Sequence, residues 1–138
     1  MADCVFCRIV AGDLPSHKVY EDRTVLAIAD IGHVNPGHTL VVVKDHAETL
    51  MDLDEEAAAD VFRAANRIAR AIEAAFAPAG LTVLQANRPA GFQTVPHFHI
   101  HLLPRHADDR VGLTWPAKNP PGDVIAGHVE RLKAALGA

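Results

Sequence analysis

Three histidines alternate with apolar residues in the segment 97–103, which reads His-Phe-His-Ile-His-Leu-Leu. Successive side chains of a β-strand point to opposite faces, so we expect His97, His99 and His101 on one face, about 7 Å apart. The alternate apolar residues then point into a core, and the β-favouring Phe and Ile argue against a helix. The segment is therefore predicted to present a row of groups that titrate near neutrality and can serve as bases, nucleophiles, hydrogen-bond partners or metal ligands.

Two chemistries are open to this row of histidines. In the first, the three imidazoles chelate one metal ion, because imidazole suits Zn²⁺ and alternate strand positions can converge on an ion. In the second, one imidazole attacks phosphorus while its neighbours bind the phosphate and direct protons. The preceding residues Gln93, Thr94 and Val95 offer an amide, a hydroxyl and successive backbone N–H groups. Such donors suit a phosphate or a developing oxyanion, so they favour the second chemistry.

Cys4 and Cys7 form a second candidate site near the start of the chain. Their Cys-x-x-Cys spacing falls on the first turn of a predicted helix, so both thiolates can reach one ion. The pattern by itself is also typical of a redox pair or of two small apolar residues. A thioredoxin-like redox role requires a preceding strand, and the sequence shows none. A tetrahedral zinc site needs two further ligands, and distant histidines are the usual partners.

The elements that must position these residues follow from periodicity and turn residues. Besides the histidine strand, apolar and β-branched runs predict strands over 18–21, 24–29, 38–44 and 81–87. Helices are predicted over 4–11, from Asp52 or Asp54 to about Phe76, and over 123–136. This order predicts an α+β fold with a mainly antiparallel sheet and with the helices packed on one side.

Both longer helices carry a predicted apolar stripe. The stripe of the first consists of Val61, Ala65, Ile68, Ile72 and Phe76, and that of the terminal helix of Val124, His128, Leu132 and Ala135. Asp52 and Glu55 fit a capping box at the start of the long helix.

Composition narrows the classes of function. A chain of 138 residues fits a single domain with a core of its own. The net charge is −4 and no Lys/Arg cluster is present, which disfavours nucleic acid and anionic membranes as partners. The first residues lack the basic start and apolar stretch of a signal peptide, and no segment is long enough to span a bilayer. We therefore expect a cytoplasmic protein, and two cysteines are too few for a disulfide framework.

The run Gln-Thr-Val-Pro-His-Phe-His-Ile-His-Leu-Leu at 93–103 resembles the histidine triad (HIT) signature, His-φ-His-φ-His-φ-φ with φ apolar. The resemblance covers nearly the whole chain, because 4–7, 30–31, 36–42 and 44–46 also match bacterial members. It implies a HIT-like domain over residues 1–138, with a sheet of about five strands, one long helix and a short N-terminal helix. The C-terminal helix then belongs to an extension of about residues 106–138.

The resemblance implies a nucleotide-binding hydrolase or transferase that attacks the α-phosphate of nucleoside phosphoramidates through a covalent nucleotidyl-histidine. Neutral imidazole is a competent nucleophile near pH 7, which makes such an intermediate reasonable. Three alternatives remain at this point: a dinucleoside polyphosphate hydrolase, a nucleotide-binding scaffold, and a zinc hydrolase that uses the three histidines as ligands.

Roles are carried over from the family residue by residue. His99 matches the nucleophile, His101 the residue at the phosphate and leaving group, and His38 the supporting histidine. Asp30 matches the acidic residue that binds ribose. The remaining substrate-binding positions are Asn87, Gln93 and Thr94, of which Thr94 also assists the leaving group. Phe6, Ile9 and Ile28 could line a pocket for the base, but each could equally belong to the core, as is usual for apolar residues.

The resemblance also implies a structural zinc ion, with no catalytic metal, and a homodimer that binds a purine nucleotide. The zinc ligands carried over from bacterial members are Cys4, Cys7, His46 and His97. The sequence departs from the family at Phe92, where many members carry Gly, and at Pro96, where many carry an aromatic residue.

Overall fold

Five strands form one antiparallel sheet in the order β1-β2-β3-β5-β4 in the computed structural model, which describes residues 3–137. The strands are β1 (Lys18–Glu21), β2 (Val25–Ala29), β3 (Thr39–Val43), β4 (Gly80–Leu84) and β5 (His99–Arg105). The histidine strand β5 lies between β3 and β4, so it is an inner strand. The predicted α+β class and the antiparallel sheet are confirmed. The ends of the expected domain, residues 1–2 and 138, lie outside the described residues.

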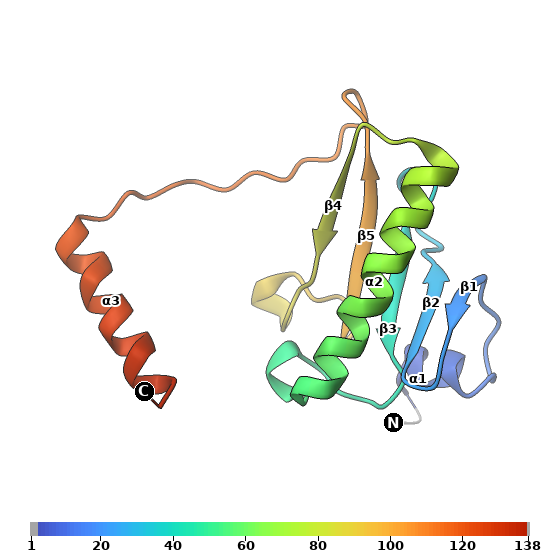
Figure 1. Cartoon of the computed structure of the whole chain (residues 1–138), viewed down its shortest axis with the longest axis horizontal. Coiled ribbons are helices and arrows are strands. Elements are labelled where there is room, and N and C mark those ends of the chain that lie inside the picture. Colours follow the sequence, from blue (N-terminus) through green and yellow to red (C-terminus); the bar gives the residue numbers. More distant parts are fainter. Residues whose placement is uncertain (1–2, 138) are drawn as a thin grey trace.

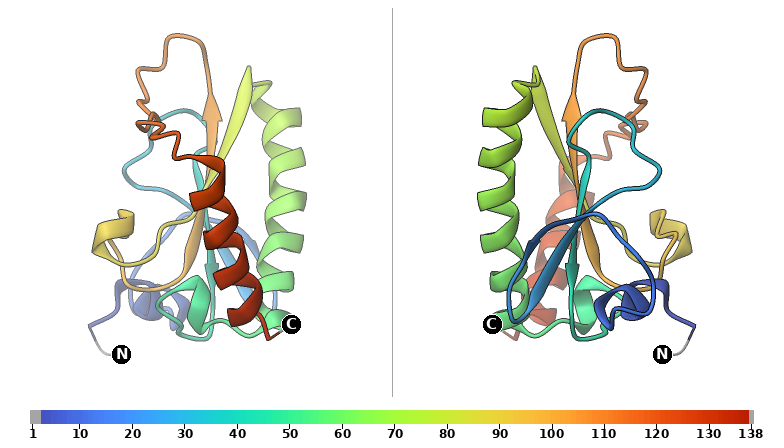
Figure 2. Two further views of the ribbon diagram at one scale, coloured as in Figure 1. Left: turned by 90° about the vertical axis from the view of Figure 1, so that its left-hand side faces the viewer. Right: turned by 90° about the vertical axis from the view of Figure 1, so that its right-hand side faces the viewer.

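Helices lie on both sides of this sheet, so the expectation that all of them pack on one side is wrong. The long helix α2 (Glu55–Phe76) covers one face, whereas α1 (Val5–Val10) lies on the other, as Figure 2 shows. Two short 3₁₀ helices, η1 (Leu50–Asp52) and η2 (Pro89–Gly91), are part of loops. The apolar stripe of α2 needs a continuous apolar surface, and only the face opposite the histidines provides one.

Side chains along β5, and along the residues just before it, point alternately to the two faces of the sheet. This alternation divides the core into two parts. Phe98, Ile100 and Leu102 are fully buried between the sheet and α2. On the opposite face Phe6 of α1 packs on a smaller cluster that includes Ile28. Because α1 is much shorter than α2, it leaves part of the sheet face that carries the histidines uncovered.

Several element boundaries differ from the prediction, most by one residue and a few by two or three. Asp54, not Asp52, caps α2, and the predicted Asp52–Glu55 box is absent because the Asp52 carboxylate accepts hydrogen bonds from the backbone and hydroxyl of Thr49. β4 ends at Leu84 rather than at residue 87. β5 begins at His99 rather than at residue 97, because the His97 N–H donates locally to the Val95 carbonyl.

Gly37 sits where the chain passes close to the end of α2. Its φ is +93°, and a Cβ there would lie 2.8 Å from Cδ2 of Phe76, the last residue of the predicted stripe. We expect Gly37→Ala to lower the free energy of unfolding by about 2–4 kcal/mol, the sum of left-handed strain and overpacking. Urea denaturation measures this loss.

Gly12 provides the matched control for Gly37. Its φ is +85°, yet a Cβ there meets nothing within 4 Å. Gly12→Ala should therefore cost only the conformational part, about 1–2 kcal/mol. Equal losses in the two variants would contradict the close contact with Phe76.

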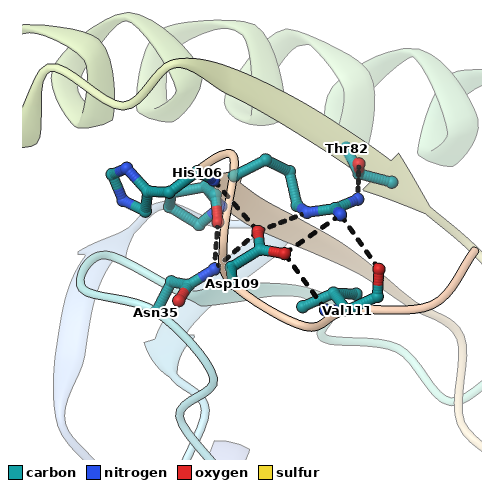
Figure 3. Close-up of polar contacts among 7 residues, drawn as sticks. Asn35, Thr82, His106, Asp109 and Val111 are labelled. Carbon is teal, nitrogen blue, oxygen red and sulfur yellow. Dashed lines mark hydrogen bonds and ion pairs between the residues drawn. The ribbon is translucent and has the colours of Figure 1, made fainter.

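After β5 the chain turns and leaves the sheet. A polar network fixes this turn (Figure 3): the Arg105 guanidinium donates to both carboxylate oxygens of Asp109, at 2.7 and 3.2 Å, and also to Thr82 and the Val111 carbonyl. The hydrogen bonds from Arg105 are the main reason why the pKa of Asp109 lies well below its usual range. Asn35 also donates to this carboxylate.

Beyond this network the chain runs as an extended segment to α3 (Gly122–Ala135), which lies apart from the sheet in Figure 1. α3 buries none of its side chains within this chain. The predicted helix is therefore present, whereas its predicted stripe has no packing partner in this chain. Among the described residues no helix combines the length and apolarity that crossing a bilayer requires.

Candidate active site

His97 turns its ring toward α1 and away from the other two histidines. Its Nε2 lies 2.6 Å from the Val43 carbonyl oxygen, which can only accept, so Nε2 carries the proton. Nδ1 is then left with a lone pair, and it lies 3.2 Å from the Cys4 sulfur and 3.1 Å from Nδ1 of His46. The backbone of β3 thus selects the His97 tautomer that is able to bind a metal.

His99 has the opposite tautomer. Its Nδ1 lies 2.7 Å from the carbonyl oxygen of His97, so Nδ1 carries the proton and Nε2 has the free lone pair. The residue is 7% exposed, and burial lowers the pKa of its imidazole. The ring is therefore neutral near pH 7, as a nucleophilic imidazole must be.

His101 belongs to a short hydrogen-bonded chain with His38. The Val34 N–H donates to Nδ1 of His38, which leaves the proton of the neutral His38 ring on Nε2. That nitrogen lies 3.0 Å from Nδ1 of His101 and 3.3 Å from a carboxylate oxygen of Asp30. His101 therefore accepts at Nδ1 and carries its own proton on Nε2, where it is able to donate to a bound group.

Asp30, His38 and His101 together have the side-chain types of a metal site, but the positions of the protons on the two imidazoles argue against a bound metal. One ligand atom each from Asp30, His38 and His101 lies within 4.8 Å of the others. A metal on Nε2 of His38 would displace the proton from that nitrogen, while Nδ1 is already occupied by the Val34 N–H. The cluster is thus better described as a hydrogen-bonded relay that orients His101.

A pocket of about 360 Å³ opens over His99 and His101. One part is apolar and contains Phe6 and Ile9 of α1 together with Ile28 and Leu40 of the sheet. The other part brings together Asp30, Thr94, His99 and His101. The shape suits a ligand with one flat apolar group and one polar group. A hollow of about 410 Å³ between α2 and the 33–39 segment is lined mostly by apolar side chains and lacks His99. We therefore regard the smaller pocket as the site of chemistry.

Two of the predicted substrate-binding residues, Gln93 and Asn87, do not line this pocket. The Gln93 side chain accepts from the Arg88 N–H and donates to the Glu48 carbonyl. Asn87 accepts from the Leu50 N–H. In this structure both side chains brace loops beside the site.

Four residues from distant parts of the chain make up a candidate metal centre. The ligand atoms of Cys4, Cys7, His46 and His97 lie within 4.8 Å of one another, and the Cys7 sulfur is 3.2 Å from Nδ1 of His46. A tetrahedral zinc ion with Zn–N bonds of about 2.0–2.1 Å and Zn–S bonds of about 2.3 Å requires ligand atoms separated by about 3.3–3.8 Å. The observed spacing of 3.1–3.5 Å between nitrogen and its neighbours is close to that requirement. Two thiols and two imidazole nitrogens fit zinc, and all four positions are filled by protein.

Several contributors to the pocket carried no signal in the sequence. Leu14, Pro15 and Ser16 line it because the chain after α1 returns across the histidine face. The carbonyls of Val43 and His97 set two tautomers, and backbone groups are identical at every position of a sequence. Arg105 does not line the pocket, because its guanidinium forms an ion pair with Asp109.

The relay predicts a specific dependence of stability on pH. Burial, followed by the neighbouring imidazoles, lowers the pKa of His101 to about 4 from its ordinary value of 6.5. Between these values the unfolded chain binds more protons at this site, so stability falls as the pH falls from about 6.5 toward 4. The slope attributable to His101 is at most about 1.4 kcal/mol per pH unit.

Urea unfolding of wild type and His101→Gln at pH 7, 6 and 5 tests this dependence. The difference between the two proteins isolates His101, and the variant should show the shallower loss of stability with acid. His106→Gln removes an exposed imidazole nearby and serves as the control. An identical slope in wild type and His101→Gln would contradict the assignment.

The comparisons with known proteins agree with this architecture. The family model described as HIT domain matches residues 11–108. "Protein hit" of Bacillus subtilis is 46% identical over 114 residues, which cover 82% of this chain and 79% of that protein. The "Adenosine 5'-monophosphoramidase hnt1" of Schizosaccharomyces pombe is 36% identical over 115 residues, which cover 83% of this chain and 84% of that protein.

Solved structures match this chain over more of its length than the family model does. A HIT family protein from Bacillus anthracis superposes with a TM-score of 0.92 at 36% identity, and the alignment covers 96% of both chains. A Zn-bound histidine triad family protein from Mycobacterium smegmatis gives a TM-score of 0.76 at 35% identity, covering 97% of this chain and 98% of that one. The matched sequence, the fold and the histidine strand together show that the chain belongs to the histidine triad (HIT) family.

Proposed function

We propose that this protein hydrolyses nucleoside 5′-phosphoramidates, AMP or GMP linked to an amine, at the α-phosphorus. The observation that carries the proposal is the tautomer of His99, whose free Nε2 belongs to a neutral imidazole at the pocket. A relative of this chain carries the name adenosine 5'-monophosphoramidase, which supports the same substrate class.

The reaction proceeds in two displacements at phosphorus. Nε2 of His99 forms a bond to the α-phosphorus while the P–N bond to the amine breaks, and the amine takes up a proton from water as it leaves, assisted by the Thr94 hydroxyl. His101 donates from Nε2 to a phosphate oxygen, with His38 holding its ring. Water then attacks the phosphorus, the bond to His99 breaks, and the nucleoside monophosphate and a proton are released.

The remaining parts of the substrate are assigned to the rest of the pocket. We place the purine against Phe6, Ile9 and Ile28, and the ribose hydroxyls at the Asp30 carboxylate. Gln93 and Asn87 act at this site as residues that set the loop beside the phosphate.

Zinc enters the proposal as a structural ion. Cys4, Cys7, His46 and His97 would hold it, and it would join α1 to the sheet beside the pocket. All four positions would be taken by protein atoms, so this ion would leave no open position for the substrate. His97 faces this centre, whereas the relay holds Nδ1 of His101, so the three histidines are unsuited to chelating one ion as a zinc hydrolase requires.

We further propose that two copies form a homodimer. α3 exposes Val124, Ile125, Val129 and Leu132 on a helix of 14 residues, a length that is marginal in water without a packing partner. The Bacillus anthracis structure superposes over 96% of this chain, so its alignment extends into the C-terminal segment. A second copy would cover α3, and sedimentation equilibrium should give twice the chain mass.

A comparison of substrates tests the proposed activity. Adenosine 5′-phosphoramidate, its GMP counterpart and a diadenosine polyphosphate are supplied at equal concentrations, and the initial rates are compared. We expect faster release of amine from the phosphoramidates, with a first-turnover burst equal to the enzyme concentration if loss of the nucleotidyl group is slow. Preference for the polyphosphate would establish the alternative hydrolase, and nucleotide binding without turnover would establish the scaffold.

A further inference from the structure

Phe92 has an unusual backbone conformation for its residue type. Its φ is +77° and its ψ is 17°, which is the left-handed region that disfavours bulky L-residues. Its side chain is 86% exposed, so the ring gains little from burial within this chain. Neither the intrinsic backbone preference of phenylalanine nor burial of its ring therefore explains this conformation.

The surrounding loop holds Phe92 in this conformation. The Arg88 carbonyl accepts from the N–H groups of both Gly91 and Gln93, and the Phe92 N–H donates to the Pro89 carbonyl. The Gln93 side chain closes the same loop by accepting from the Arg88 N–H. Strain of this kind persists where its surroundings fix it, and it gathers at functional sites.

The neighbouring Gly91 makes it more notable that phenylalanine, and not glycine, occupies position 92. It lies directly before Phe92, its φ is not positive, and a side chain there would meet nothing within 4 Å. The one glycine of the loop thus stands beside the position that requires left-handed backbone. A large aromatic residue occupies that position instead.

Phe92 belongs to the loop that leads to the polar part of the pocket, next to the residues that line it. Phe92 is two residues before Thr94, whose side chain lines the pocket, so their Cα atoms lie within about 7.6 Å. η2 lies on the same side of the sheet as α1 (Figure 2). The apolar part of the pocket is built from α1 and strands β2 and β3. With the nucleoside in that part, as proposed above, the amine of the substrate would point toward the loop.

We propose that Phe92 determines specificity by packing its ring against the amine portion of the substrate. The proposal rests on the phosphoramidase activity proposed above. The amines that fit best carry a planar aromatic group, because an isolated, uncharged phenyl ring gains most from stacking with another ring. The favoured substrates are thus nucleoside phosphoramidates of arylalkylamines.

Two AMP conjugates that differ only in the amine test this proposal. One carries phenethylamine and the other methylamine, and kcat/KM is measured for each with wild type, Phe92→Leu and Phe92→Gly. We expect the ratio of phenethylamine to methylamine conjugate to fall about fivefold in both variants, while the methylamine conjugate changes less than twofold. Phe92→Gly should also raise the melting temperature, because glycine relieves the left-handed strain.

Phe62→Leu is the matched control, since Phe62 is a half-exposed phenylalanine on α2, across the sheet from the site. Its kcat/KM ratio should equal that of wild type. An unchanged ratio in Phe92→Leu would overturn the specificity role. Equal losses on both conjugates, together with dissociation of the dimer, would assign the ring to a subunit contact instead and also overturn it. Wild type that cleaves neither conjugate would refute the proposed function itself, which is a distinct result.

Discussion

His99→Asn is expected to lower kcat for adenosine 5′-phosphoramidate at least about a thousandfold, because it removes the imidazole nitrogen that bonds to phosphorus in the proposed mechanism. Binding of AMP should change less than about threefold, since the asparagine amide is small and leaves the apolar part of the pocket intact. Stopped assays give kcat, and isothermal titration gives the AMP affinity.

A second measurement identifies the intermediate directly. Wild type quenched in alkali during turnover of a slow conjugate should gain the mass of one nucleotidyl group, whereas His99→Asn should gain none. His17→Ala, which removes an exposed imidazole outside the pocket, should behave as wild type. Turnover by His99→Asn within tenfold of wild type would exclude the covalent mechanism and leave direct attack by water.

Removal of zinc is expected to unfold the protein more readily than it slows the reaction. The double variant Cys4→Ser, Cys7→Ser should lose the proposed zinc ion and lower the melting temperature by about 10 °C or more. The reason is that the four ligands join α1 to the segment before β5 and to the segment after β3. Their loss would leave α1 held mainly by the packing of its apolar side chains on the cluster around Ile28.

The matched comparison for zinc is between two histidines. His46→Ala should lose zinc and stability, whereas His17→Ala, an exposed residue outside the metal centre, should lose neither. Metal content is measured by atomic absorption, and melting by circular dichroism. A protein that retains its melting temperature after chelation but loses all activity at once would favour a catalytic metal instead.

The sequence predicted which strand carries the site and which of its side chains face the core better than it predicted the tertiary contacts of those side chains. The alternation of polar and apolar residues in β5 is a property of every strand with one buried face, so the burial of Phe98 and Ile100 followed directly. Residues that lie on the same strand, such as His99 and His101, were consequently predicted together.

Features that depend on tertiary contacts were not predictable in this way. The tautomers of His97 and His99 depend on which carbonyl faces each ring, and Gln93 makes hydrogen bonds to the backbone of a segment 45 residues away. The placement of helices on both faces depends on which sheet face is wholly apolar. The stripe of α3 shows the same limit, because periodicity indicates an apolar surface but not the molecule that covers it.

The hydrogen-bonded network around Asp109 marks the boundary between the sheet domain and the C-terminal segment. Every residue that satisfies this carboxylate lies between Asn35 and Val111, and the part of the chain that matches the family model ends at residue 108. A cut after Val111 would therefore remove no partner of the buried ion pair. A change in length or sequence beyond Val111 would therefore leave this network, and the strand that carries His99, intact.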